Sequence, residues 1–112
     1  MYEIRSYQFE PTMFDEYKSW VQKRALPWLV KQLDLVGFWT NVPERVEIDM
    51  VPTDEPAAAN ITWIIRWPDK ATRDVEFERI FGSDEWAEIF KDVPGGFDSY
   101  LRTEAKFAEQ LA

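Results

Sequence analysis

Residues 60–67 read NITWIIRW, and this stretch predicts a β-strand more strongly than any other part of the chain. Its β-branched and aromatic residues alternate between two faces, and Pro68, which cannot donate to a sheet, ends it. The two faces consist of Thr62, Ile64 and Arg66 and of Trp63, Ile65 and Trp67. The larger aromatic row favours packing beneath helices, with the lining of a pocket as the alternative, and the sequence leaves open which row faces a pocket.

Three further stretches have the pattern of strands. They are residues 2–9 (YEIRSYQF), 35–42 (LVGFWTNV) and 97–107 (FDSYLRTEAKF). Between the second of these strands and residues 60–67, the irregular segment 43–59 carries three prolines and an alternating stretch around Ile48. We interpret residues 43–59 as an extended hairpin arm, and whether it contacts a partner subunit stays open.

Two helical regions separate the strands. From Pro11 onward, apolar residues recur at spacings of three and four and form one stripe, which predicts a core-facing helix. Pro27 lies inside that pattern and removes a backbone donor, so we expect a kink or break near Leu26. A second helix over residues 69–80 is ended by Gly82, and Ser83 is placed to cap a short third helix.

The resulting order is β-α-β-β-α-β, which predicts an α+β, ferredoxin-like domain with a four-stranded antiparallel sheet and helices on one face. One such layer leaves the other face of the sheet bare, and we expect Glu3, Arg5 and Tyr7 to lie there. A half-apolar sheet face is usually covered, and a second copy of the chain is the cover we expect.

Composition limits what the domain does. A chain of 112 residues forms one domain, 1–112, and it contains neither Cys nor His. That excludes a thiolate nucleophile, a Ser-His-Asp triad and the usual zinc ligands, and we expect no cofactor or metal. The net charge of −8 argues against nucleic acid or an anionic membrane as a partner. No apolar run approaches the roughly 20 residues of a membrane span, so a cytoplasmic location is expected.

Several short motifs, in order along the chain, resemble the NIPSNAP family. They are residues 2–7 (YEIRSY), Glu16-Tyr17, residues 25–27 (ALP), residues 36–40 (VGFWT) and residues 83–86 (SDEW). The resemblance implies a dimeric α/β barrel, in which the sheets of two chains face each other. Fold relatives include cofactor-free monooxygenases, muconolactone isomerase, dye-decolourising peroxidases and haem-degrading enzymes, so the fold alone assigns no reaction. Near Trp63, where family members can carry a histidine, this chain has none.

Seven residues are candidates for lining a pocket: Glu3, Arg5, Tyr7, Trp39, Trp63, Arg66 and Arg102. Glu3 and Arg5 form a structural ion pair or jointly hold a polar ligand. Tyr7 is a core residue or a proton donor, and the arginines would hold an anionic group. Two functions follow: a protein that binds or transforms a small aromatic or anionic molecule, or a non-catalytic dimeric module. Neither the catalytic residues nor the substrate can be named from the sequence.

Overall fold

The structure is a computed structural model that describes residues 1–44, 46–49 and 59–112. Its elements in chain order are β1 (Tyr2–Phe9), η1 (Pro11–Met13), α1 (Phe14–Trp20), η2 (Val21–Ala25), α2 (Leu26–Gln32), β2 (Leu35–Thr40), β3 (Ile61–Arg66), α3 (Lys70–Phe81), α4 (Asp84–Phe90), η3 (Gly96–Ser99) and β4 (Tyr100–Ala108). The strands and helices alternate as the sequence predicted, which confirms the βαββαβ order.

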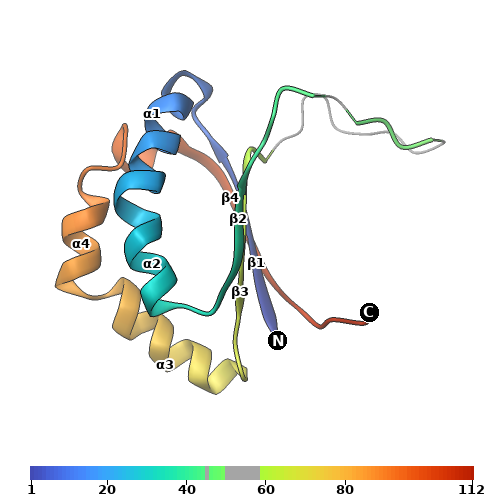
Figure 1. Cartoon of the computed structure of the whole chain (residues 1–112), viewed down its shortest axis with the longest axis vertical. Coiled ribbons are helices and arrows are strands. Elements are labelled where there is room, and N and C mark those ends of the chain that lie inside the picture. Colours follow the sequence, from blue (N-terminus) through green and yellow to red (C-terminus); the bar gives the residue numbers. More distant parts are fainter. Residues whose placement is uncertain (45, 50–58) are drawn as a thin grey trace.

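The four strands form one antiparallel sheet in the order β2-β3-β1-β4. Because β1 and β2 both run antiparallel to β3, which lies between them, the first half of the chain is a split βαβ unit. Among residues 1–44, 46–49 and 59–112, all helices lie on one face of this sheet, and none lies on the other face (Figure 1). The ferredoxin-like α+β fold is therefore confirmed.

The structure corrects our assignment of the faces of β1. Glu3, Tyr7 and Phe9 are buried beneath the helices, whereas we expected the row containing Glu3 and Tyr7 on the bare face. The register explains the difference, because Arg5 lies opposite Trp63 and the row of Glu3 continues the row of Trp63 across the sheet. Burying the aromatic row of Trp63 under the helices removes the most apolar surface from water. Because the row of Glu3 on β1 lies on the same face, it is buried as well.

The first helical layer has a defect at the place that Pro27 predicts. Between α1 and α2, η2 forms a π-helical turn, in which the backbone nitrogen of Leu26 donates to the carbonyl of Val21. The wider turn ends at Ala25, two residues before Pro27, which lies in the first turn of α2, where its missing N–H is not needed. The apolar stripe is buried as expected, at Tyr17, Val21, Ala25 and Leu29.

The second helical layer consists of two helices, α3 and α4, and the N-terminus of each is capped by a side chain. The Asp69 side chain accepts from the backbone nitrogen of Thr72 at the start of α3, and Ser83 does the same for Trp86 at the start of α4. Gly95 and Gly96 have φ angles of 71° and 67°, so the chain turns sharply before η3. The last strand consequently begins at Tyr100 and ends at Ala108, later than the predicted 97–107.

The predicted arm at residues 43–59 lies largely outside the described residues, which here are 43–44, 46–49 and 59. Its base is fixed to the sheet, because the backbone nitrogen of Asn41 donates to the carbonyl of Asn60 at 3.0 Å. From there the segment that follows β2, drawn in green, runs away from the sheet on the side opposite the helices (Figure 1).

Candidate functional site

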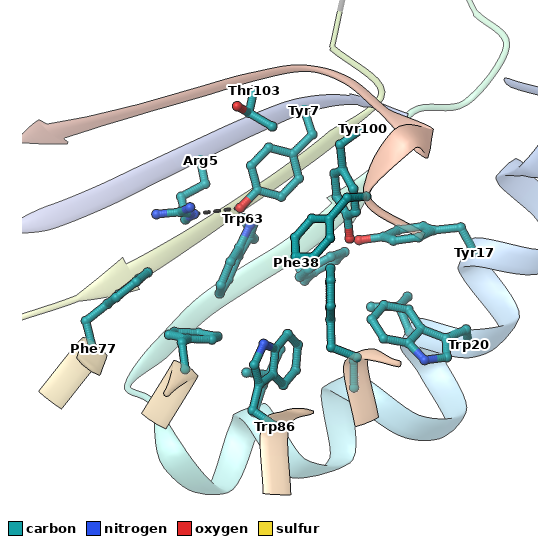
Figure 2. Close-up of a pocket in the computed structure, with 16 residues that line it drawn as sticks. Arg5, Tyr7, Tyr17, Trp20, Phe38, Trp63, Phe77, Trp86, Tyr100 and Thr103 are labelled. Atoms are coloured by element: carbon teal, nitrogen blue, oxygen red, sulfur yellow. Dashed lines mark hydrogen bonds between the residues drawn. The ribbon is translucent and has the colours of Figure 1, made fainter. Parts of the chain in front are cut away.

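A cavity of about 400 Å³ lies between the sheet and the helices. Its lining side chains are Arg5, Tyr7, Phe38, Trp63, Tyr100 and Thr103 from the sheet, Tyr17, Trp20, Val21, Ala25 and Leu29 from the first helical layer, Phe77, Phe81, Trp86 and Phe90 from α3 and α4, and Phe97 from η3 (Figure 2). Phe97 lines the cavity although it is 77% exposed, which places the mouth beside η3. Most of the wall consists of aromatic rings, which suits a flat apolar molecule.

The local structure of η2 explains why there is space for a cavity next to it. The π-turn of η2 presents Val21 and Ala25 to the cavity, and their short side chains leave space that longer residues would fill. Opposite them, the rings of Trp86 and Phe90 pack at 5.6 Å between centroids and form a continuous aromatic surface on α4.

One end of the cavity is polar. The Nε of Arg5 donates to the Tyr7 hydroxyl at 2.6 Å, so the phenol proton is directed to another acceptor. The Arg5 guanidinium also lies 5.7 Å from the centroid of the Trp63 ring. Among the described residues, the Trp63 indole nitrogen is a buried side-chain donor without a hydrogen-bond partner. Figure 2 shows Arg5, the Tyr7 hydroxyl and this nitrogen at the same end of the cavity.

Glu3 binds Arg5 on the side of the guanidinium away from the cavity. This carboxylate is 1% exposed and does not line the cavity. It accepts from Arg5 Nη1 at 2.6 Å, from Arg73 Nε at 2.8 Å and Nη2 at 3.0 Å, and from Trp67 Nε1 at 3.1 Å. Burial raises the pKa of Glu3, but the hydrogen bonds from Arg73 and Arg5 outweigh it and hold that pKa below its usual value. Glu3 is therefore ionised at neutral pH.

The same contacts keep Arg5 charged. Burial lowers the pKa of Arg5, but Tyr7 and Glu3 outweigh it and raise that pKa above its usual value. A cationic guanidinium, a phenol and an indole N–H thus face one end of the cavity, and all of them donate hydrogen bonds. This arrangement suits an oxygen acceptor, above all an anionic one.

A second polar pair lies where α1 meets β4. Figure 2 shows the hydroxyl oxygens of Tyr17 and Tyr100 next to each other. Burial is the main cause that raises the pKa of each phenol, so both stay neutral at physiological pH. They offer a ligand a neutral polar contact without adding charge.

The structure brings three of the seven candidate residues together in the cavity wall, namely Arg5, Tyr7 and Trp63, with Glu3 directly behind them. The remaining three lie on the opposite face of the sheet, because strand alternation places them in the other row. They are Trp39, Arg66 and Arg102.

These three residues have other neighbours on the bare face. Trp39 is 50% exposed, and its ring lies so close over Gly37 that a Cβ there would be 2.3 Å from it. Arg66 approaches Asp34 at 3.7 Å, and Arg102 approaches Glu104 at 3.9 Å. None of them lines the cavity between sheet and helices.

Sequence reasoning missed the aromatic residues that α1, α4 and the last strand contribute. Trp20, Trp86 and Tyr100 lie far apart in the chain, and their spacing is that of ordinary core residues. The one signal that pointed to them is the aromatic content of 16%, which is high for a single small core. Arg73 gave no signal, because its partner Glu3 lies 70 residues away.

The residues that the structure describes contain no group of three or more carboxylates, thiols or imidazoles that could hold a metal ion. Within that same part of the chain, no helix is long and apolar enough to cross a membrane.

Comparison with known proteins gives matches in structure alone. No protein-family model matches the sequence, and a search of curated proteins finds no match. An uncharacterized NIPSNAP domain protein from Burkholderia xenovorans superposes with a TM-score of 0.73 at 17% identity, covering 99% of this chain and 94% of that one. Protein Atu4242 from Agrobacterium tumefaciens, a NIPSNAP family protein of unknown function, gives a TM-score of 0.71 at 19% identity over 94% of this chain and 88% of that one.

A structure described as an antibiotic biosynthesis monooxygenase is a more distant neighbour, with a TM-score of 0.58 at 10% identity over the full length of both chains. At these identities the likeness concerns the fold. The resemblance to NIPSNAP proteins that the sequence suggested is thus confirmed at the level of the fold, and no specific activity comes with it.

Proposed function

We propose that the cavity binds a small, flat organic molecule that presents an oxygen acceptor to Arg5, Tyr7 and Trp63. The observation that carries this proposal is the buried, unpartnered indole nitrogen of Trp63 beside the Arg5 guanidinium. Leaving a buried donor unsatisfied costs about 1–3 kcal/mol, and a ligand oxygen would recover that cost. The charge of Arg5 favours a carboxylate, phenolate or enolate over a neutral carbonyl.

Size and lining agree with this class of ligand. Small-molecule pockets are mostly apolar with a few convergent polar groups, and a volume of about 400 Å³ lies within their usual range. In this wall, Phe81 packs edge to face against both Trp63 and Trp86, at interplanar angles of 72° and 89°.

Chemistry at this site would rest on orientation and on the three donors. Donors that are fixed before the ligand binds stabilise negative charge that develops on its oxygen, so the site suits a reaction through an enolate or phenolate. In this proposal Tyr7 would transfer a proton to that oxygen, because its hydroxyl accepts from Arg5 at 2.6 Å and its own proton can therefore be donated elsewhere. The monooxygenase neighbour has the same fold, which is compatible with small-molecule chemistry in a cavity of this kind.

The proposal is tested by calorimetric titration of the protein with 2-naphthoate and anthracene-9-carboxylate. We expect saturable binding, weakened at least tenfold by Arg5→Gln and roughly fivefold by Trp63→Phe, which removes the indole N–H. The matched controls are Arg66→Gln and Trp39→Phe, which change the same residue types on the opposite face and should leave the affinity unchanged. Absence of saturable binding for both acids, or equal losses in the controls, would show that the cavity has another role.

We also propose that a second copy of the chain covers the bare face of the sheet. That face carries the half-buried Ile4 and Ile64 beside the exposed Trp39, an apolar strip that no helix of the described part of the chain covers. Light scattering at micromolar concentration should give twice the mass of the chain, and Ile64→Glu should reduce it to that of one chain. The control Val75→Glu alters an exposed residue of α3 and should leave the dimer intact. A monomeric wild-type protein would refute the proposal.

A further inference from the structure

We infer that Arg73, which lies outside the cavity wall, is a positioning residue that leaves the charge of Arg5 available to an anionic ligand. This inference rests on the proposed function of the cavity. It concerns the choice between anionic and neutral ligands of the same shape, which the wall residues alone do not decide.

The geometry shows that Arg73 is the main partner of Glu3. Arg73 binds both carboxylate oxygens, through Nε to Oε1 at 2.8 Å and Nη2 to Oε2 at 3.0 Å, whereas Arg5 reaches Oε2 alone at 2.6 Å. A two-point contact of this kind is the strongest pairing that a guanidinium and a carboxylate form. The charge of Glu3 is thus largely neutralised by Arg73. Glu3 therefore fixes the position of Arg5 but cancels little of its charge.

Behind the cavity, five charged side chains form one line of successive ion pairs, and their charges alternate in sign. Lys70 pairs with Asp74 at 2.7 Å, Asp74 pairs with Arg73 at 3.3 Å, and Arg73 pairs with Glu3, which pairs with Arg5. Three cations and two carboxylates leave a surplus of one positive charge, and the line ends on Arg5 at the cavity. Without Arg73 the line divides into two neutral pairs, and the cavity end loses its surplus.

Packing holds the two guanidiniums in this relation. The ring of Phe77 lines the cavity, and its centroid lies 4.0 Å from Cζ of Arg73 and 5.3 Å from Cζ of Arg5. Both cations therefore contact one aromatic ring, which favours their charge and fixes their positions. A change at Arg73 reaches the ligand through Glu3 and Arg5, without any contact to the ligand itself.

The experiment measures a preference, defined as the affinity for 2-naphthoate divided by the affinity for the neutral 2-acetylnaphthalene. This ratio is insensitive to the fraction of folded protein, because both ligands need the same cavity. Arg73→Gln should lower the preference roughly fivefold, the effect of one unit charge at a partly screened site. Arg73→Lys retains the charge and should keep the preference within about twofold. The control Arg79→Gln removes a cation from the exposed side of the same helix and should have no effect.

The effect of Arg73→Gln is measured again in a Glu3→Gln background, where the side chain at position 3 carries no charge. There Arg73→Gln should leave the preference within about twofold, because the carboxylate that Arg73 neutralises is absent, and no unpaired carboxylate remains to prevent folding. If wild type binds both ligands and Arg73→Gln leaves the preference unchanged when Glu3 is present, or lowers it roughly fivefold in the Glu3→Gln background as well, the inference is wrong and the proposed function stands. If wild type binds neither ligand, the proposed function is wrong and the inference falls with it.

Discussion

Replacing Glu3 by Gln should lower the free energy of unfolding by about 3 kcal/mol. The side chain is 1% exposed and lies among two guanidiniums and one indole N–H. Gln has the same shape and retains one acceptor oxygen. Its amide group, however, points two hydrogens at groups that are themselves donors.

The magnitude follows from the contacts that are lost. Removing one partner of a buried ion pair typically costs about 3–5 kcal/mol, because the other charge stays buried without compensation. Here Arg5 and Arg73 are both partly exposed, at 21% and 20%, so water relieves part of that cost. We therefore place the loss near the lower end, which is still a large part of the roughly 5–15 kcal/mol that stabilises a domain of this size.

Urea unfolding at pH 7, followed by tryptophan fluorescence, measures this loss. The control is Glu104→Gln on β4, whose side chain is 52% exposed and 3.9 Å from Arg102, and its effect should stay below about 0.5 kcal/mol. Equal m-values for the variants and wild type would show that the same transition is compared. A loss below about 1 kcal/mol for Glu3→Gln would refute the reasoning that the cluster stabilises the fold.

Three more predictions follow from the same structure. The pKa of Glu3 is lowered from 4.5, so its contribution to the free energy of unfolding is fully present above that pH and is lost as the pH falls through the lower folded-state pKa. The urea midpoints of wild type and Glu3→Gln should therefore converge in acid. A constant difference down to pH 3 would contradict this. Gly95→Ala should cost about 1–3 kcal/mol by thermal unfolding, because φ is 71° and a Cβ would lie 1.9 Å from Ser99 Oγ, and an unchanged melting temperature would refute that strain. Asp69→Ala should cost about 1 kcal/mol in urea through loss of the cap on α3, while no change would show that the cap is dispensable.

The sequence was sufficient for the fold where the signals are local. Strand alternation, the Ser83 cap and the position of Pro27 each depend on neighbours within a few residues, and each appears in the structure where expected. The start of the last strand was set too early because the two glycines before it take left-handed φ angles and add a turn. The segment that contains residues 50–58 lies outside the described residues.

The faces of the sheet are fixed by the register between neighbouring strands, which the sequence of one strand does not show. The pattern of β3 alone favoured the row of Trp63 beneath the helices, with pocket lining as the alternative, and β1 alone led us to expect Arg5 on the bare face, yet these residues are direct neighbours in the register. Two residues opposite each other on adjacent strands always share a face, so one of the two assignments had to be wrong.

The site itself depends on contacts between distant segments, which one sequence does not reveal. Trp20 and Trp86 lie 6.5 Å apart between ring centroids but 66 positions apart in the chain. The brace on Arg5 likewise comes from Glu3 on the same strand and from Arg73 on α3. The residue types suggested an ion pair on β1, and only the packing of α3 shows that a second arginine shares it.

The most direct test of the account is the nitrogen-15 spectrum of the tryptophan indoles. Six tryptophans give six indole N–H peaks, and the Trp63 peak is the one that Trp63→Phe removes. On saturation with 2-naphthoate, this peak should move downfield as the buried N–H gains an acceptor, while the peak of Trp39 on the opposite face should stay in place. An unmoved Trp63 peak, with the ligand bound and another indole shifted in its place, would contradict the central claim that the cavity holds an oxygen acceptor at Arg5, Tyr7 and Trp63.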